Sequence, residues 1–321
     1  MAPDPLATVD IEALLARMRP KLHRYCARLV GSVIDGEDVL QDALIKAMGA
    51  LQSVTPVVNT EGWLFRIAHN TALDFLRRRN RQEALHSAEE VEMIADQLDD
   101  VESRQIAATS LRTFMRLPVA QRSSVILMDV LGCSLAEVCD IMDFSLPAVK
   151  AALHRGRTQL REFAGEPDDV PQPGLSEADR TRLNAYVGHF NARDFDAIRA
   201  MIADDVRLEL VNRTRLNGKA EVSRYFGNYS VVSDWHLVPG LVEGRPAILV
   251  LDPAAPGAPP RYFMLLSWSG DKVATIRDFR HAPYIADGAE YLMLQDYFAS
   301  RPAGASEDQS IDASITSDVR R

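Results

Sequence analysis

The clearest pattern of apolar and polar positions along the chain lies in residues 61–81. At about 3.6 residues per turn, this segment has one apolar face and a separate polar face. The apolar face holds Leu64, Ile67, Ala68, Thr71, Ala72, Phe75 and Leu76, and the polar face holds Arg66, Asn70, Asp74, Arg77 and Arg81. The pattern predicts a two-sided helix whose last turns carry several arginines, where cations complement the negative end of the helix dipole.

The polar face of this helix has two interpretations. A run of charges is typical of a solvated surface helix. The composition also suits nucleic acid, because arginines neutralise phosphates and an amide such as that of Asn70 can hydrogen-bond to base edges.

Two more helices are predicted within residues 11–48, separated by a break at residues 31–36. The second of these helices carries Asp38, Gln41 and Asp42 on a polar stripe opposite apolar side chains. Acidic residues near the start of a helix can simply complement its dipole, so the stripe by itself does not identify a binding site.

A helix-turn-helix is predicted over residues 134–161. Asp143 and Phe144 fill the turn, and Ser145 caps the second helix. A positive φ in this turn would suit Asp143 better than Phe144. The second helix has no acidic residue between Ser145 and Arg161, and its basic side chains are Lys150, His154, Arg155, Arg157 and Arg161. We expect this helix to lie in the major groove of DNA.

Three segments are too acidic or too polar to form a core. Residues 83–103 contain eight acidic residues and no Lys or Arg, residues 165–176 are rich in Pro, Gly and acid, and residues 300–321 are short of apolar side chains. They are predicted to be an acidic linker, a second linker and a disordered tail. The expected domain order is therefore 8–82, 83–103, 104–164, 165–176, 177–299 and 300–321.

Beyond the second linker the pattern changes from helices alone to helices followed by strands. Helices are predicted over residues 177–190, 195–203 and 218–226, and strands over residues 206–211, 247–251, 262–268 and 273–279. This order predicts an α+β cone with a curved antiparallel sheet. The whole chain is therefore expected to be a multidomain protein, with two all-α domains before the cone.

His236, Asp278 and His281 fall on or beside the predicted strands of the cone. Burial can tune the pKa of a carboxyl or imidazole group for proton transfer, so these residues are candidates for a pocket. The ordinary alternative is a structural role with satisfied hydrogen bonds.

Composition narrows the class of protein. The chain has 321 residues, of which 47% are hydrophobic and 25% charged, as is usual for soluble globular proteins. The cysteines Cys26, Cys133 and Cys139 are too scattered to form a disulfide framework or a metal site. We expect them to be thiols in the core of a protein of the reducing cytoplasm. No metal and no cofactor is expected. No apolar run is long enough for a membrane span. The net charge of -9 argues only weakly against DNA, because binding depends on local patches.

The helix of residues 61–81 resembles region two of extracytoplasmic-function sigma factors, a class of small bacterial sigma factors. The resemblance rests on Trp63, Leu64, Phe65, Arg66, Ile67, Ala68, Asn70, Asp74 and Arg77 to Arg79. It implies that this helix and the loop of residues 56–61 melt the minus-ten promoter element and read it as single-stranded bases. The implied contacts are Trp63, Arg66, Asn70, Asp74, Arg77, Arg78 and Arg79. It also implies that Asp38, Gln41 and Asp42 dock on the beta-prime clamp of core RNA polymerase.

The predicted helix-turn-helix resembles region four of the same family, which reads the minus-thirty-five element. Leu117, Pro118 and Arg122 match the opening of that region, and His154, Arg155 and Arg157 match its closing run. The implied contacts are Ser145, Lys150, His154, Arg155, Arg157 and Arg161, with the beta flap of polymerase as a further partner. The family often has glycine in the turn where this chain has Asp143 and Phe144.

The C-terminal part resembles a SnoaL-like domain of the nuclear-transport-factor-like fold, which is fused to some of these sigma factors. The matching motifs are Asn191 to Phe195, Ala203 to Val206 and Asn217 to Lys219, whereas the linker and glycine-rich segment of the best-known fused class are missing. The resemblance implies a regulatory domain, not an enzyme, that contacts the sigma domains of the same chain. A ligand-responsive helix-turn-helix regulator and a cone with isomerase or cyclase activity are the alternatives.

Overall fold

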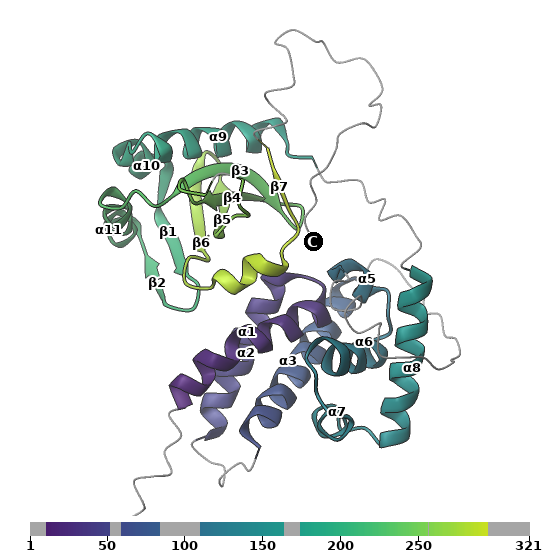
Figure 1. Cartoon of the computed structure of the whole chain (residues 1–321). Coiled ribbons are helices and arrows are strands. Elements are labelled where there is room, and N and C mark those ends of the chain that lie inside the picture. The colour runs from purple at the N-terminus through teal and green to yellow at the C-terminus, as the bar shows by residue number, and fades with distance from the viewer. Residues whose placement is uncertain (1–10, 52–58, 84–109, 164–173, 256, 295–321) are drawn as a thin grey trace, which may run out of the picture. The chain divides into compact units, whose positions relative to one another are not determined.

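The computed structural model describes residues 11–51, 59–83, 110–163, 174–255 and 257–294. The chain divides into two compact units, residues 1–169 and 170–321 (Figure 1). The tail and nearly all of the two predicted linkers lie outside the described residues, as do residues 56–58 of the predicted minus-ten loop.

The described part of the first unit is helical. Its elements are α1 (Ile11–Val30), α2 (Val33–Leu51), α3 (Thr60–Glu83), α5 (Leu111–Met115), α6 (Val119–Val125), the π-helical turn η1 (Ile126–Val130), α7 (Leu135–Met142) and α8 (Leu146–Phe163). Apolar side chains from all of these helices form one continuous core, in which Leu22, Leu64, Phe114 and Val149 are almost fully buried. The periodicity of the sequence is explained by this core, because each helix turns its apolar stripe toward it.

The connection between α1 and α2 is shorter than the sequence predicts. Gly31, with a φ of 81°, ends α1, and α2 begins two residues later. Gly36 was expected in the break but lies inside α2, where an added Cβ would be 2.6 Å from the Cα of Ala27. The glycine is therefore explained by the close approach of two helices and not by a turn.

The helix-turn-helix is formed by α7 and α8. Ser134 and Glu137 make a capping box at the start of α7, and the Ser145 hydroxyl accepts a hydrogen bond from the Ala148 N–H at the start of α8. Asp143 takes the left-handed conformation that ends α7, with a φ of 58°. Phe144 therefore does not take a positive φ. An aspartate occupies the turn in which the resembled sigma-factor family often has glycine.

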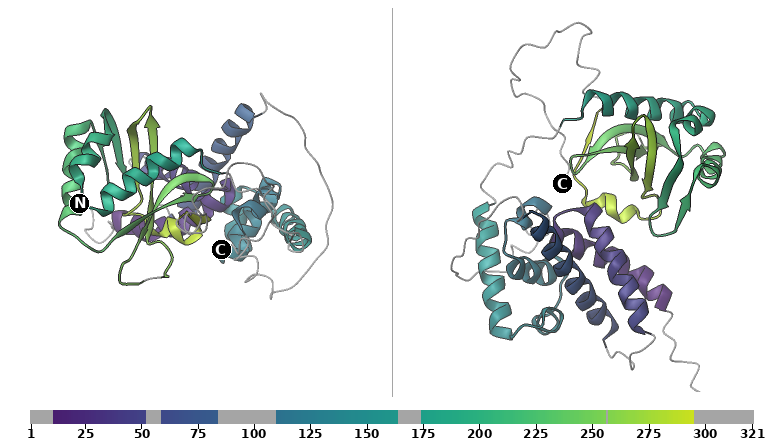
Figure 2. Two further views of the ribbon diagram at one scale, coloured as in Figure 1. Left: turned by 90° about the horizontal axis from the view of Figure 1, so that it is seen from above. Right: turned by 180° about the vertical axis from the view of Figure 1, so that it is seen from behind.

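The described part of the second unit combines three α-helices with a seven-stranded sheet. Its elements are α9 (Glu177–Asn191), α10 (Phe195–Met201), β1 (Ile202–Leu210), β2 (Thr214–Asn217), α11 (Lys219–Ser230), β3 (His236–Val242), β4 (Arg245–Leu251), β5 (Tyr262–Ser269), β6 (Lys272–Asp278), the 3-10 turn η2 (Pro283–Gly288) and β7 (Tyr291–Met293). The strand order is β2-β1-β6-β5-β4-β3-β7. Helix α9 packs on β3 and β4 and helix α11 packs on β1 and β2, so the helices cover the curved sheet (Figure 1, Figure 2). The α+β class predicted from the sequence is confirmed.

The sheet differs from the prediction in two respects. It is mixed and not wholly antiparallel, because β1 and β6 run parallel. Between them the chain forms β2 and α11 and then three antiparallel strands, which return β6 to the side of β1. The sequence also did not predict β2, β3 and β7. Strand β3 contains Pro239 and Gly240, which are typical of turns and hid its apolar pattern.

Substitution of Gly36 tests the close approach of α1 and α2. Gly36→Ala should lower the free energy of unfolding by about 1–3 kcal/mol, because its methyl group would overlap the backbone of Ala27. Gly49→Ala is the matched control in the same helix, since no atom lies within 4 Å of a Cβ added there. It should stabilise the chain by about 0.5–1 kcal/mol, because alanine favours helix. Urea denaturation followed by far-ultraviolet circular dichroism measures both values, and equal effects would contradict this explanation of Gly36.

Candidate nucleic-acid interface and the polar core of the second unit

Helix α3 exposes most of the polar residues that the sequence assigns to the minus-ten element. The exposed side chains are Arg66, Asn70, Asp74, Arg77, Arg78 and Arg81. The opposite side of the helix is buried, with Leu64, Ala68 and Leu76 each at most 5% exposed. Trp63 is half-buried against the core. The exposed edge therefore offers cations and an amide along several turns of one helix.

The ion pairs along this edge are weak. Asp74 lies 3.3 Å from Arg77 and 3.7 Å from Lys46, and all three side chains are about half exposed or more. Arg66 lies 3.8 Å from Asp143. Exposed pairs of this kind contribute roughly 0–1 kcal/mol, so a phosphate group can replace the carboxylate as the partner of either arginine.

Arg79 differs from the neighbouring arginines. Its Nη1 donates to the carbonyl oxygen of Val30, 3.0 Å away, and its guanidinium lies 5.9 Å from the ring centre of Phe75. Val30 is the last residue of α1, whose final carbonyls have no partner within the helix. Arg79 thus connects α3 to the end of α1. In the run from Arg77 to Arg79, the exposed cations are therefore Arg77 and Arg78.

The basic residues of α8 also differ from one another, because some are exposed and Arg157 is held by a partner within the unit. Lys150 is exposed, and His154, Arg155 and Arg161 are half-buried. Arg157 donates two hydrogen bonds to the Asp129 carboxylate of η1, with Nε to Oδ2 at 2.9 Å and Nη2 to Oδ1 at 2.5 Å. The Asp129 side chain is only 2% exposed. A bidentate pair to a buried carboxylate is strong and costly to break, so Arg157 fixes α8 on η1.

Helix α2 carries the residues predicted to dock on polymerase. Asp38 and Asp42 are exposed and Gln41 is half-buried. Ile45 and Met48 follow at helical spacing and are 58% and 50% exposed. This stripe joins carboxylates to exposed apolar side chains, a combination that suits a protein partner.

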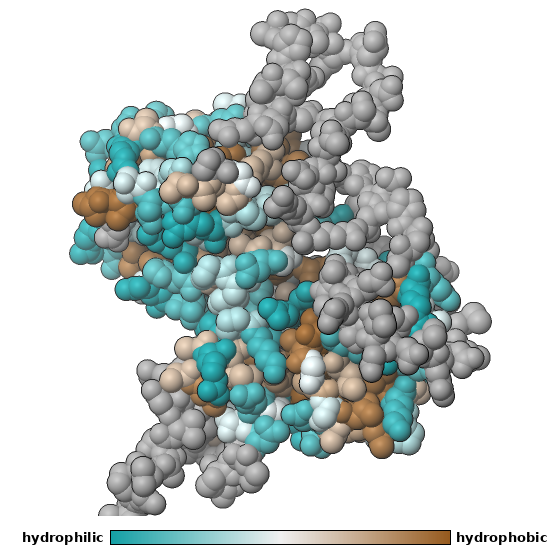
Figure 3. Space-filling view, viewed as in Figure 1, coloured by the Kyte–Doolittle hydropathy of each residue, from teal (hydrophilic) through white to brown (hydrophobic). Residues whose placement is uncertain are grey.

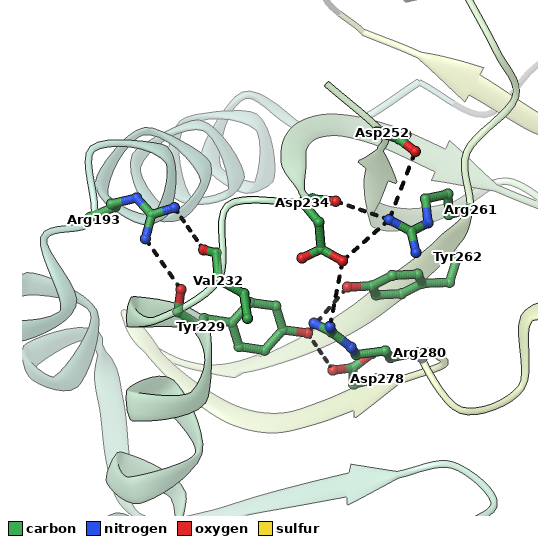
Figure 4. Close-up of polar contacts among 9 residues, drawn as sticks. All are labelled: Arg193, Tyr229, Val232, Asp234, Asp252, Arg261, Tyr262, Asp278 and Arg280. Carbon is green, nitrogen blue, oxygen red and sulfur yellow. Dashed lines mark hydrogen bonds and ion pairs between the residues drawn. The ribbon is translucent and has the colours of Figure 1, made fainter. Parts of the chain in front are cut away.

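The second unit has a buried polar cluster around Asp278, the last residue of β6 (Figure 4). The Asp278 side chain accepts hydrogen bonds from the hydroxyl groups of Tyr225 and Tyr229, at 2.5 and 2.9 Å. It also accepts one from the backbone N–H of Arg280 at 2.8 Å. Tyr225 and Tyr229 are four residues apart on α11, so both project from the same face of that helix.

Arg280 connects this cluster to more exposed charges. Its guanidinium lies 5.2 Å from the ring centre of Tyr229 and 6.0 Å from that of Tyr262. It also lies 3.9 Å from the Asp234 carboxylate, which is 3.4 Å from Arg261. Figure 4 shows this chain of charges running alongside the tyrosine rings.

Burial raises the pKa of the Asp278 carboxyl above its ordinary value, because the charged form loses its solvation. The hydrogen bonds from the two tyrosines and from Arg280 oppose this shift. His236 is exposed at the start of β3, and His281 is partly buried, which lowers its pKa. Of the three residues proposed for a pocket, Asp278 alone therefore lies in the interior.

The aromatic partners of Asp278 were missed in the sequence. The spacing of Tyr225 and Tyr229 on a predicted helix was the available signal, but nothing in the sequence connects that helix to a strand 49 or more residues later. Two other polar atoms in this unit, the Tyr186 hydroxyl and Trp235 Nε1, are buried without a hydrogen-bond partner among the described residues. Buried donors of this kind are rare in native proteins.

The stability of the second unit should depend on pH through Asp278. Because its folded pKa is raised, the folded state binds more protons than the unfolded state just above the ordinary carboxyl pKa. Stability should therefore fall as pH rises through the folded pKa. Asp278→Asn cannot ionise, so the wild type should lose stability relative to this variant as pH rises above about 4, the ordinary pKa of an aspartate carboxyl group.

Thermal unfolding followed by tryptophan fluorescence measures this difference. Asp271→Asn, at an exposed turn of the same unit, is the control and should follow the wild-type profile. A constant difference between wild type and Asp278→Asn at every pH would refute the assignment.

Two further features are absent among the described residues. Within them, no group of three or more His, Cys, Asp and Glu side chains is placed to hold a metal ion. None of the described helices has both the length and the apolar character needed to cross a membrane.

Family comparisons match the first unit twice. A family model described as Sigma-70 region 2 matches residues 14–82, and one described as Sigma-70, region 4 matches residues 111–160. These ranges contain α3 and the α7–α8 pair respectively. The order of the two regions along the chain is the order predicted from the motifs.

Three known proteins resemble the chain over different lengths. The ECF RNA polymerase sigma factor SigE of Mycolicibacterium smegmatis is 29% identical over 164 residues, which cover 50% of this chain and 63% of SigE. SigG of Mycobacterium tuberculosis is 27% identical over 301 residues, 84% of this chain and 81% of SigG, so the similarity extends into the second unit. The crystal structure of SigJ from the same organism covers 84% of this chain and 95% of its own, at 18% identity and a TM-score of 0.33.

A further relative shows the family. The ECF RNA polymerase sigma factor SigM of Mycobacterium tuberculosis is 32% identical over 154 residues, which cover 48% of this chain and 76% of SigM. This identity extends over most of SigM, and both sigma regions match in order within one helical unit. The chain belongs to the family of ECF RNA polymerase sigma factors.

Proposed function

We propose that this protein binds core RNA polymerase and directs transcription initiation at a promoter with two elements. Helix α2 docks on the beta-prime clamp through Asp38, Gln41 and Asp42, and the α7–α8 region approaches the beta flap. Helix α3 opens and reads the minus-ten element, and α8 reads the minus-thirty-five element. The observation that carries this proposal is the exposed edge of α3, where arginines flank Asn70 on a helix whose other face is buried.

The chemistry of this edge fits a single strand. Exposed arginines attract successive phosphates, while the Asn70 amide can pair with the edge of an unstacked base. Trp63 lies on the same helix and offers an aromatic surface for stacking. The net charge of -9 does not oppose this use, because the attraction depends on the local patch and on the polymerase to which the chain is bound.

We further propose that the second unit regulates the sigma domains by contact and not by catalysis. The predicted linker of residues 165–176 is short, which would keep the unit at an effective concentration in the millimolar range. Even a weak interface would then be populated. Whether contact inhibits or supports promoter binding depends on which arrangement of the two sigma domains it favours.

A cone that binds or converts a small molecule is the second candidate. It is favoured by the Asp278 cluster and by the buried, unpartnered polar atoms of Tyr186 and Trp235. A carboxyl group with a raised pKa stays protonated to a higher pH. Beside phenol groups, it can then donate its proton, or a hydrogen bond, to an oxygen atom of a ligand. A ligand-responsive regulator would use the same cluster without turnover.

Reconstitution with core polymerase tests these proposals. The full chain should allow core enzyme to initiate at a genomic promoter at which core alone is silent, and a chain ending at Phe163 should initiate with altered efficiency. Asp278→Asn and His236→Ala should leave regulation by the second unit largely intact. Absence of initiation at every promoter would refute the sigma function, and loss of a measurable turnover in these variants would favour the enzyme.

Substitutions on α3 separate phosphate contacts from base contacts. Arg77→Ala or Arg78→Ala should weaken promoter binding by the reconstituted holoenzyme on all sequences and reduce the dependence on salt. Asn70→Ala should instead cost about 1–3 kcal/mol at particular bases of the minus-ten element. Quantitative binding to a set of single-base promoter variants measures both effects. Equal loss on every sequence for Asn70→Ala would contradict a base contact.

A further inference from the structure

The start of helix α8 is both exposed and apolar. Phe144, in the turn, is 42% exposed, and Leu146, the first residue of α8, is 45% exposed. Pro147 and Ala148 follow and are also exposed, whereas Val149 is buried in the core. The helix already buries its core-facing side, so packing within the unit does not explain these large apolar side chains at the surface.

This apolar surface lies at the part of a helix-turn-helix that meets base edges. In such motifs the N-terminal residues of the second helix enter the major groove. Lys150 is exposed one turn further along, and Arg155 and Arg161 continue the basic character of the helix. Brown, apolar residues are visible at the surface where α7 leads into α8 (Figure 3).

The side chains at this position restrict how a base can be read. Leu146, Pro147 and Ala148 have no side-chain donor or acceptor, so they cannot form the bidentate hydrogen bonds that select guanine or adenine. The apolar group that a base presents in the major groove is the C5 methyl group of thymine. Contact with an aliphatic or aromatic side chain removes both surfaces from water and distinguishes thymine from the other bases.

We propose that Phe144 and Leu146 read thymine methyl groups in the major groove of the minus-thirty-five element. This inference rests on the proposed function of α8 as the reader of that element. Lys150, Arg155 and Arg161 supply the attraction to phosphate, and methyl contacts supply part of the sequence preference. DNA is favoured over a protein partner because the helix has no acidic residue between Ser145 and Arg161.

Replacement of thymine by 2′-deoxyuridine tests the proposal, because this change removes the methyl group and keeps every hydrogen-bonding group. The holoenzyme of full chain and core polymerase is bound to a promoter at which it initiates, with each upstream thymine replaced in turn. At one or more positions the substitution should weaken binding about fourfold, the value expected for one buried methyl group. Leu146→Ala or Phe144→Ala should abolish the difference between thymine and deoxyuridine at the same position.

Lys150→Ala is the matched control on the same helix. It should weaken binding to thymine and deoxyuridine templates by the same factor, because it acts on phosphate. Circular dichroism checks that each variant is folded, and both apolar residues are exposed enough for the fold to tolerate alanine.

Several outcomes would overturn the inference. Equal binding to thymine and deoxyuridine at every upstream position, with initiation intact, would refute methyl reading and leave the sigma function standing. Leu146→Ala that weakens both templates equally, or that alters self-association in sedimentation or affinity for core polymerase, would assign the apolar surface to another contact. Failure to initiate at any promoter would instead refute the proposed function itself.

Discussion

Burial of one face of α3 is the constraint on which the first unit depends. Ala68 and Ala72 are fully buried on this face, and small side chains allow α3 to lie close to α1 and α2. Once this face is buried, the helix has no freedom to rotate, and Arg66, Asn70 and Arg77 must point outward, at intervals of about one turn and two turns. The geometry of the candidate DNA contacts is therefore a consequence of core packing.

Polar contacts inside the unit fix the orientation of the packed helices. The hydroxyl group of Tyr25 in α1 lies 2.6 Å from Nδ1 of His69 in α3, and burial lowers the pKa of His69 to about 4. The imidazole is thus neutral near pH 7 and pairs with Tyr25 without adding a buried charge. Arg19 of α1 pairs with the buried Glu37 of α2 at 2.7 Å. Apolar stripes bring the three helices together, and these contacts fix how they are rotated.

The sequence alone was sufficient to predict structural features that depend on neighbouring residues. The two faces of α3 and the cap of α8 each follow from residues within one or two turns. It was insufficient where the cause is distant. The roles of Arg157 and Arg79 depend on Asp129 and Val30, 28 and 49 residues away, and no periodicity reveals such partners. The same limit hid the tyrosines around Asp278 and the parallel pairing of β1 with β6.

The two candidate DNA-binding helices expose different chemistry, and this difference follows the state of the DNA that each would meet. Helix α3 exposes arginines and an amide, which suit phosphates and unpaired base edges. Helix α8 begins with exposed apolar side chains, which can distinguish thymine by its methyl group in an intact major groove. A methyl contact is worth less than a bidentate hydrogen bond, so recognition by α8 would be modest for each base. Because the chain as a whole is acidic, such modest contacts would discriminate between promoters only when the polymerase already holds the chain on DNA.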